Sequence, residues 1–477
     1  MKVLFATSEI APWVKTGGLG DVAAALPPAL RAAGIDVRVL APYYPALRQA
    51  FPDDVAPIVA TLDGFGGHFA GSALRVAVAP DGTPLMLVDS LAYFDRPGNP
   101  YLGPEGHDWL DNHLRFGLLS RIAAWLGSEE NFLPWRPDLI HCNDWQTALT
   151  PAYLHLLPGS RARSLVTVHN LAFQGLFGQH TLHELGLPAS AWSMHGVEYF
   201  GYLSFLKAGL LYANAITTVS PTYAVEIQTD AEGMGLSGLL RDRKADLAGI
   251  LNGIDTTAWN PARDPYLPFP YDAKRLKDKV KNKAALQKET ALEIRDDVPL
   301  IGVVSRLTHQ KGLDLLPLVQ QEIAKLPAQL VVLGSGERSL EDAFRRLATS
   351  HPGQFAVRVG FDEGLAHRIE AGADMFLMPS RFEPCGLNQM YSLRYGTPPI
   401  VRATGGLADT VIDGVNGFSF REPTAVALLA TIRRAVKAWH HKDVWRRLQV
   451  DGMARDVGWS NPASQYAALY DKLIVAP

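Results

Sequence analysis

Short β-rich runs alternate with segments of helical length along almost the entire chain. Such alternation predicts parallel sheets whose two faces are covered by helices, which is an α/β architecture. In the first half, strands are expected within residues 3–9, 36–44, 85–89, 139–143, 164–170 and 215–220. In the second half, they are expected within residues 299–307, 328–336, 355–361, 374–380 and 398–404. Two such series predict two doubly wound domains that bind ligands at the carboxyl ends of their strands.

A segment rich in Asn, Asp and Pro, and then in Lys, separates the two series at residues 251–283. This composition is typical of a linker that leads into a surface helix. Length alone would also permit three domains of about 150 residues, but large α/β domains fit equally well. We therefore place the domain boundary near Asn252, with one domain in residues 1–251 and the other in residues 252–456.

Composition excludes several classes of protein. With 45 Lys and Arg against 48 Asp and Glu, the formal charge is −3, which gives no case for binding nucleic acid or an anionic membrane. Cys142 and Cys385 are too few and too far apart for a disulfide framework or a zinc cluster. The first apolar run is too short for a signal peptide, and no run approaches the roughly 20 apolar residues of a membrane span. A cytoplasmic protein is expected.

A glycine loop, "KTGGLGDV", lies between the first expected strand and an alanine-rich segment. Gly17 and Gly18 allow a ligand to approach the backbone closely, and the following helix would direct free N–H groups at it. Lys15 adds a cation, so the loop suits a phosphate. An ordinary strand-to-helix turn with a solvated lysine is the alternative.

The alanine-rich segment, "LGDVAAALPPALRAAG", is expected to form a helix that ends at Gly34. Pro27 and Pro28 conflict with an uninterrupted helix, because proline lacks an N–H and its ring crowds the preceding turn. We therefore expect a kink or a restart at these prolines.

Polar side chains follow four of the expected strands. In the first half, "HCNDW" places Asp144 after one strand and "VTVHNLAFQG" places His169 after the next. In the second half, "VVSRLTHQKG" places Arg306 and Lys311 after one strand, and "MPSRFEPCGLNQ" places Glu383 after another. Since ligands bind at these strand ends, all five are candidate site residues. A histidine without a known partner is, however, often only structural.

Arg306 and Lys311 are two cations in one loop and could neutralise a diphosphate through charge-assisted hydrogen bonds. Gly312 is expected to begin a helix whose N-terminus adds a partial positive charge. No Asp-x-Asp pair occurs in the sequence, which favours a site without a metal. Both residues could instead be ordinary surface charges.

Glu383 precedes "PCGLNQMYSLRYG", an expected helix with Pro384 near its first position. Its carboxylate could accept sugar hydroxyls or stabilise positive charge, while Gly386 and Leu387 offer N–H groups to a phosphate. A capping carboxylate is the alternative. A second turn, "TGGLADTV" at residues 404–411, echoes the first glycine loop and could approach the same ligand.

Five motifs together resemble the bacterial glycogen synthases and plant starch synthases: "KTGGLGDV", "HNLAFQG", "VVSRLTHQKG", "SRFEPCGLNQMYSLRYGT" and "TGGLADTV". They occur in the family's order, and the resemblance covers essentially the whole chain. It implies a GT-B fold with two Rossmann-like domains facing a deep cleft, and a final helix, within residues 457–477, that returns to the first domain. It also implies glucose transfer from ADP-glucose to the non-reducing end of an α-1,4-glucan such as glycogen, with retention of configuration and without a metal or other cofactor.

The resemblance assigns roles to the residues around the donor diphosphate. Arg306 and Lys311 match the pair that grips the diphosphate. Lys15 and the backbone of Gly17–Gly18 complete this grip, and Asp21 matches an acidic position in the glycine loop.

Other matched positions lie around the sugar and the base. Glu383 resembles the carboxylate near the transferred glucose, and His169 resembles the histidine that contacts its 6-hydroxyl. Asp144 and Asn252 match positions at the glucose end of the cleft. Phe361 resembles the residue that stacks on the adenine.

Two positions depart from the family pattern. Tyr391 stands eight residues after Glu383, where retaining enzymes of this fold often have a second glutamate, so a mechanism with paired carboxylates is not expected. Asn143 replaces a histidine found in some bacterial relatives, which removes an acid–base role at that position. The leaving phosphate is then expected to take the proton of the acceptor.

Several readings of the function stay open at this point. A UDP-glucose-dependent glucosyltransferase and a sugar-nucleotide epimerase share the expected architecture, and ADP-glucose is preferred by resemblance alone. An inert glucan-binding protein is a further alternative, although the set of Lys15, Arg306, Lys311 and Glu383 is intact. A phosphorylase would need a lysine-bound pyridoxal phosphate, which no feature of the sequence demands.

Overall fold

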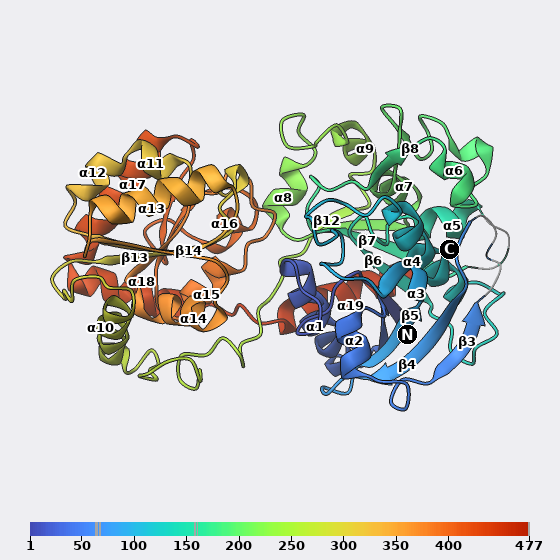
Figure 1. The fold of residues 1–477 in the computed structure, drawn as a ribbon, viewed down its shortest axis with the longest axis horizontal. Coiled ribbons are helices and arrows are strands. Elements are labelled where there is room, and N and C mark those ends of the chain that lie inside the picture. Colours follow the sequence, from blue (N-terminus) through green and yellow to red (C-terminus); the bar gives the residue numbers. More distant parts are fainter. Residues whose placement is uncertain (63–64, 66–67, 157–158, 160, 476–477) are drawn as a thin grey trace. The chain divides into compact units, whose positions relative to one another are not determined.

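The computed structural model describes residues 1–62, 65, 68–156, 159 and 161–475. The chain forms two compact units (Figure 1). Unit 1 comprises Met1–Asn252 and Trp459–Pro477, and unit 2 comprises Gly253–Gly458. The chain therefore passes from unit 1 to unit 2 and back again. No helix in the described part of the chain is long and apolar enough to cross a membrane.

Unit 1 contains a nine-stranded sheet in the order β12-β11-β7-β6-β1-β2-β5-β4-β3. Its strands are β1 (Lys2–Ala6), β2 (Asp36–Pro42), β3 (Ile58–Leu62), β4 (Ser72–Val78), β5 (Pro84–Asp89), β6 (Leu139–Asn143), β7 (Arg163–Val168), β11 (Ala215–Thr218) and β12 (Leu247–Gly249). The pairs from β12 through β5 are parallel, as predicted. The β3–β4 and β4–β5 pairs are antiparallel and were not predicted.

A second, small antiparallel sheet in unit 1 has the order β8-β10-β9. It comprises β8 (Leu176–Gly178), β9 (Glu198–Tyr199) and β10 (Tyr202–Ser204). The helices of unit 1 are α1 (Gly18–Ala32), α2 (Pro45–Ala50), α3 (Leu91–Phe94), α4 (Asn112–Leu126), α5 (Thr150–Leu156), α6 (Thr181–Glu184), η1 (Ala189–Ala191), α7 (Phe205–Tyr212), α8 (Pro221–Glu226), α9 (Ser237–Asp242) and α19 (Ser460–Val475).

Helix α1 runs through both prolines as one continuous helix, so the predicted restart is wrong. Leu26, Pro27 and Leu30 are all buried, and this packing offsets the hydrogen bonds that the prolines cannot donate. The predicted end of the helix is confirmed, because Gly34 has a φ of 89° and terminates it.

Helix α19 packs against α1 and belongs to unit 1 (red beside blue in Figure 1). The buried His141 of β6 anchors it through a hydrogen bond of 2.7 Å between Nδ1 and the hydroxyl of Tyr470. His141 also bonds Thr167 of β7 through Nε2 at 2.6 Å. Burial lowers the pKa of His141 to about 3, so this histidine is neutral.

Unit 2 contains a six-stranded parallel sheet in the order β15-β14-β13-β16-β17-β18, as predicted for the second series. Its strands are β13 (Leu300–Val304), β14 (Gln329–Gly334), β15 (Phe355–Val359), β16 (Met375–Met378), β17 (Pro399–Arg402) and β18 (Phe418–Phe420). Its helices are η2 (Leu276–Asp278), α10 (Lys279–Glu289), η3 (His309–Lys311), α11 (Leu315–Leu318), α12 (Gln320–Ala324), α13 (Arg338–Ser350), α14 (Glu363–Gly372), α15 (Asn388–Arg394), α16 (Gly405–Thr410), α17 (Ala425–Trp439) and α18 (Lys442–Met453).

Both faces of the unit 2 sheet are covered (Figure 1). Along β14, Leu330 and Val332 pack in one apolar cluster with residues of α11, α13 and α17, and Val331 and Leu333 pack in another with residues of α10 and α14. This alternation explains why the strand reads as a continuous apolar run.

The segment expected to be a linker is part of the core of unit 2. Leu267 and Tyr271 are buried in an apolar cluster together with Tyr395. Helix α10, which follows, is not a simple surface helix, because its residues Lys279 and Lys283 are buried. Lys279 donates hydrogen bonds to two backbone carbonyls of α14 and to the hydroxyl of Thr397. Burial lowers its pKa to about 7.

Candidate active site

The glycine loop of unit 1 is organised by Glu9, a buried carboxylate that the sequence did not single out. Its Oε2 accepts hydrogen bonds from the backbone N–H of Thr16 at 2.6 Å and of Gly17 at 3.3 Å. Its Oε1 accepts bonds from the hydroxyls of Thr16 and Tyr101. Glu9 lies in the segment that follows β1, and this position after a strand was the signal that could have identified it.

Lys15 lies in this loop and pairs with Asp21 in the first turn of α1, with 2.7 Å between Nζ and Oδ1. Gly17 is the N-cap of α1, and no side chain caps the helix. Apart from its two chain neighbours, no residue that the structure describes has an atom within 4 Å of a Cβ at Gly17. The space in front of Gly17 is therefore open to a ligand, at a helix N-terminus that favours anions.

Asp144 follows β6 and has a φ of 55°, an uncommon conformation for a residue other than glycine. Its carboxylate is buried and accepts N–H groups of His169 at 2.7 Å and of Asn170 at 3.3 Å. Burial raises the pKa of Asp144 to about 7, and the negative charge of Glu9 acts in the same direction. Asp144 thus fixes the loop that carries His169.

His169 follows β7, and its Nε2 lies 2.9 Å from Oδ1 of Asn143. The Asn143 amide nitrogen donates to the carbonyl of Ala6, so its oxygen must accept from the imidazole. Nε2 therefore carries the proton, which leaves Nδ1 as an acceptor. Burial lowers the pKa of His169 to about 3, so the ring is neutral and can accept a hydroxyl donor. Asn143, expected to have no acid–base role, orients this histidine.

Asn252 is the last residue of unit 1 before the chain enters unit 2. It is buried, and its Oδ1 accepts no hydrogen bond from any residue that the structure describes. A buried acceptor of this kind is costly unless a ligand or water donates to it. Asn252 is therefore suited to bind a hydroxyl group.

In unit 2, Lys311 and Glu383 form an ion pair, with 2.6 Å between Nζ and Oε2. Ser380 donates a further bond of 2.9 Å to the same oxygen. Both charged side chains are largely buried, whereas Arg306, in the same loop as Lys311, is exposed. Instead of two equivalent cations, the structure provides one cation paired with the carboxylate and one cation directed to solvent.

The helix predicted to begin at Gly312 does not begin there. Gly312 has a φ of 65° and ends the short helix η3, and α11 begins at Leu315. A Cβ at Gly312 would lie 2.0 Å from the carbonyl oxygen of Pro379. The absence of a side chain at Gly312 therefore allows the Lys311 loop to pack closely against the end of β16. No helix begins at this residue, so no helix N-terminus contributes positive charge next to Lys311.

The helix after Glu383 begins at Asn388 and not near Pro384 as predicted, because Gly386 has a left-handed φ of 72°. Leu387 is the N-cap, and no side chain caps the helix. Among the described residues, none accepts a hydrogen bond from the N–H groups of Gly386 and Leu387. Both amides are therefore available to an anion.

The second Gly-Gly turn packs closely against the loop that carries Glu383. A Cβ at Gly405 would lie 2.0 Å from the carbonyl oxygen of Glu383, and one at Gly406 would lie 2.1 Å from that of Cys385. The N–H of Gly406 also donates to the Glu383 carbonyl at 3.2 Å. This turn supports the backbone of the Glu383 loop.

Two aromatic residues of unit 2 differ in their surroundings. Phe361, after β15, is 85% exposed and offers a free ring. Tyr391, at the position where retaining enzymes of this fold often have a second glutamate, stacks on Trp259 with 3.7 Å between ring centroids. The opposite face of Trp259 stacks on His367 at the same distance. Tyr391 is thus a packing residue of α15.

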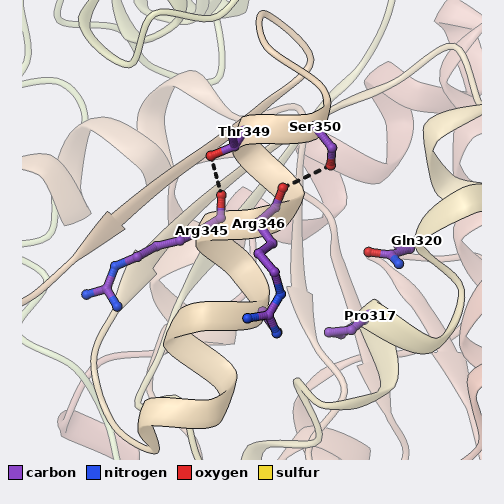
Figure 2. Close-up of a pocket in the computed structure, with 7 residues that line it drawn as sticks. Pro317, Gln320, Arg345, Arg346, Thr349 and Ser350 are labelled. Atoms are coloured by element: carbon purple, nitrogen blue, oxygen red, sulfur yellow. Dashed lines mark hydrogen bonds between the residues drawn. The ribbon is translucent and has the colours of Figure 1, made fainter.

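A hollow of about 600 Å³ lies beside α13 and contains none of the predicted site residues (Figure 2). Arg345 in its lining forms ion pairs with Glu341 and Asp342. The hydroxyls of Thr349 and Ser350 donate back to carbonyls of their own helix (Figure 2). Because these polar groups already have partners in α13, the residues at the strand ends are the better candidate for the active site.

Comparison with known proteins covers both units. Residues 2–242 match the family described as "Starch synthase catalytic domain", and residues 286–447 match "Glycosyl transferases group 1". A glycogen synthase of Dechloromonas aromatica (strain RCB) is 60% identical, over 98% of each chain. A glycogen synthase of Aromatoleum aromaticum is 54% identical, over 98% of this chain and 96% of that one.

Solved structures show the same similarity. The catalytic domain of starch synthase IV from Arabidopsis thaliana, bound to ADP and acarbose, matches with a TM-score of 0.85 and 32% identity, over 100% of this chain and 99% of that chain. Sucrose-phosphate synthase from Thermosynechococcus elongatus matches with a TM-score of 0.61 at 18% identity, over 100% of both chains, which indicates a shared fold.

Proposed function

Because the chain belongs to the glycogen synthase family of GT-B glycosyltransferases, we propose that it transfers glucose from ADP-glucose to the non-reducing end of an α-1,4-glucan, with retention of configuration. The ADP in the Arabidopsis structure supports adenine as the base of the donor. One observation carries the proposal. The loop with Arg306 and Lys311 is joined to the loop of Glu383 by an ion pair, so that two cations and a buried carboxylate belong to one group of loops.

The donor diphosphate is assigned to the cationic and amide groups. Arg306 and Lys311 neutralise its charge, and the N–H groups of Gly386 and Leu387 bind its oxygens. In unit 1, the open backbone at Gly17–Gly18 and the ammonium of Lys15 are suited to bind phosphate, with Asp21 holding Lys15 in place. No metal is required, because protein cations supply the positive charge.

The glucose and the base are assigned to the remaining residues. Nδ1 of His169 accepts a hydrogen bond from the 6-hydroxyl, and Oδ1 of Asn252 accepts one from another hydroxyl. Glu383 stabilises the positive charge that develops on the sugar ring, and Asp144 holds the His169 loop at the glucose. The exposed ring of Phe361 stacks on adenine.

The reaction proceeds without a second carboxylate, since Tyr391 is engaged in packing. The bond between the anomeric carbon and the phosphate oxygen breaks as the acceptor 4-hydroxyl attacks from the same face. A phosphate oxygen of the departing ADP takes the proton of that hydroxyl. Arg306 and Lys311 stabilise the negative charge that accumulates on ADP, and exclusion of water protects the sugar from hydrolysis.

The test is nucleotide release from ADP-glucose and from UDP-glucose, each measured with and without glycogen in a buffer that contains EDTA. We expect ADP release that depends on glycogen and persists in EDTA. Loss of activity in EDTA would contradict the metal-independent mechanism, and faster release of UDP would contradict the adenine assignment. Absence of release from both donors would leave an epimerase or an inert glucan-binding protein.

A further inference from the structure

The turn that carries Lys311 is too short to hold its own position. It is the single 3₁₀ turn η3, and two backbone hydrogen bonds of 3.0 Å, donated by the N–H groups of Lys311 and Gly312, close it. Such a turn is marginal by itself, because its formation orders several residues for few hydrogen bonds. The ion pair with Glu383 cannot be its only anchor, since a bound diphosphate would compete with this carboxylate for the ammonium of Lys311. The position of Lys311 therefore depends on contacts with neighbouring loops.

Arg381, in the loop that follows β16, binds this turn through both its main chain and its side chain. Its backbone N–H donates to the carbonyl of Gln310 at 2.8 Å, and its Nη1 donates to the carbonyl of His309 at 2.8 Å. These two residues of η3 directly precede Lys311. Because β13 and β16 are neighbouring strands, Arg381 joins the loop that carries Lys311 to the loop that carries Glu383.

Asp314 lies three residues after Lys311 and completes this link. Its two carboxylate oxygens accept hydrogen bonds from Nη1 and Nη2 of Arg381 at 2.6 Å and 2.8 Å, which is the bidentate geometry of a strong ion pair. These hydrogen bonds from the Arg381 guanidinium hold the pKa of Asp314 below its usual range, so its carboxylate is charged at neutral pH. Arg381 thus binds residues on both sides of Lys311 in the chain.

The place of Asp314 in its helix indicates that the pair with Arg381 replaces a local contact. Asp314 is the N-cap residue of α11, and an aspartate in this position ordinarily accepts an N–H group of its own helix. In the described part of the chain, its side chain makes no such bond. The local sequence favours a helix cap, but the folded chain uses both carboxylate oxygens to bind Arg381.

We infer that Arg381, held by Asp314, is a positioning residue that determines where the ammonium of Lys311 stands at the donor diphosphate. The inference rests on the proposed function, in which Lys311 neutralises that diphosphate. When the diphosphate attracts the ammonium away from Glu383, the backbone on both sides of Lys311 stays bound to Arg381. A catalytic group displaced by about 1 Å can lower turnover about 10²-fold. Arg381 itself does not bind the diphosphate in this arrangement, because Asp314 neutralises its charge.

The test uses Asp314→Asn and Arg381→Lys, with Arg434→Lys as a matched control. Arg434 also forms a bidentate ion pair, with Asp413, and also donates to a backbone carbonyl, that of Ser419 in β18, but these partners lie outside the candidate site. The measurements are kcat and KM for ADP-glucose, Kd for ADP by titration calorimetry, and the melting temperature, which verifies that each variant is folded. ADP carries the negative charge of the departing group, so its Kd reports the contact with Lys311 without turnover.

We expect Asp314→Asn and Arg381→Lys to lower kcat about 10–100-fold and to raise Kd for ADP about 3–10-fold, whereas Arg434→Lys should change neither. Charge alone predicts the opposite for Asp314→Asn, since removal of a negative charge near the site would strengthen ADP binding. Charge alone also predicts full activity for Arg381→Lys, which keeps the positive charge but loses the bidentate geometry.

A double-variant cycle shows whether the pair acts through Lys311. Asp314→Asn or Arg381→Lys, added to Lys311→Ala, should lower kcat no further, because the group that they position is already absent. A general loss of structure would lower kcat by the same factor with and without Lys311.

The outcomes separate this inference from the proposed function. Near-normal kcat and Kd for ADP in both variants would overturn the inference, as would tighter ADP binding by Asp314→Asn or equal losses of kcat with and without Lys311. Absence of glycogen-dependent ADP release in the unsubstituted protein would instead refute the proposed function. In that case the ADP titrations still decide whether Asp314 and Arg381 act on the binding of a diphosphate.

Discussion

Glu9 and Glu383 are both buried carboxylates, and each accepts hydrogen bonds from a neighbouring loop: Glu9 from Thr16 and Gly17, and Glu383 from Lys311. The sequence identified Glu383, because it follows an expected strand within a motif of polar residues. It did not identify Glu9, because this residue lies at the end of the segment expected to form the first strand, residues 3–9. Periodicity locates the end of a strand, but it does not show which later loop returns to that end.

The Lys311–Glu383 pair gives the two cations of unit 2 different effects on stability. We expect Lys311→Ala and Arg306→Ala each to lower kcat by about 10²–10³-fold, the scale of lost transition-state charge stabilisation. Only Lys311→Ala should also lower the melting temperature, because it leaves the buried Glu383 without its cation. Initial rates and thermal unfolding check both expectations.

A double variant provides the control for this prediction. Lys311→Ala combined with Glu383→Gln should recover much of the lost stability, since no unpaired charge stays buried, while activity stays low. Near-normal turnover in Lys311→Ala would remove this lysine from the site. Equal melting temperatures for the two single variants would contradict the role of the ion pair in stability.

Asp144 should make stability depend on pH in a defined direction. Burial raises its pKa to about 7, above the value of about 3.9 in an unfolded chain. Between these values the native state binds more protons than the unfolded state, so the stability contributed by the protonated carboxyl is lost as pH rises from about 4 to about 7. In Asp144→Asn this loss should be absent.

The measurement is the free energy of unfolding by denaturant for both proteins at several pH values. The free energy of Asp144→Asn relative to the unsubstituted protein should increase between pH about 4 and about 7 and then level off. Parallel pH profiles for the two proteins would show that Asp144 titrates in the same range whether the chain is folded or unfolded.

At the level of elements, the sequence predicted the longer strands of the two parallel series and missed the antiparallel strands and the strands of only two or three residues. Strand β6 coincides with the expected run at residues 139–143, because all five of its residues are buried. The strands β3, β9 and β10 escaped prediction, since β3 is partly exposed and the others have only two or three residues. Such short strands show too little alternation to be recognised.

The two Gly-Gly turns look alike in sequence but differ in the structure, and alanine substitution should distinguish them. Gly17→Ala should leave the melting temperature unchanged, because no protein atom occupies the space of the new Cβ and a φ of −162° suits any residue. It should nevertheless raise KM for ADP-glucose if the donor approaches this backbone. Gly406→Ala should lower the melting temperature, because its Cβ would lie 2.1 Å from the Cys385 carbonyl oxygen.

Thermal unfolding and donor-saturation curves test this pair of variants, with each serving as the control for the other. An unchanged KM for ADP-glucose in Gly17→Ala would indicate that the first turn is not part of the donor site. An unchanged melting temperature in Gly406→Ala would contradict the close packing of the second turn.

At the level of the whole molecule, unit 1 is completed by a helix from the far end of the chain. The sequence predicted this return only through family resemblance, because amphipathicity shows that a helix has a buried face but not which sheet covers it. Buried side chains of α19, among them Tyr466, pack in the apolar core of unit 1, and the hydrogen bond between Tyr470 and His141 adds a specific polar contact. No pattern in the sequence links two residues so distant.

Removing this contact should destabilise unit 1. Tyr470→Phe keeps the ring but leaves Nδ1 of His141 buried without its partner, which should cost about 1–3 kcal/mol of unfolding free energy. Denaturant unfolding measures the change, and Tyr202→Phe, which alters an exposed tyrosine, is the control. Equal effects of the two substitutions would show that the hydroxyl of Tyr470 contributes no more than a solvated one.

The insertion of unit 2 between two parts of unit 1 also sets the order in which the units can be completed on the ribosome. Unit 2 is one continuous segment, Gly253–Gly458, and can pack its sheet as soon as it has emerged. Unit 1 emerges first but lacks α19 until translation has passed through all of unit 2, at about 5–20 residues per second. During that interval the surface of α1 that α19 covers stays open, so unit 1 cannot complete its core before unit 2 has been synthesised.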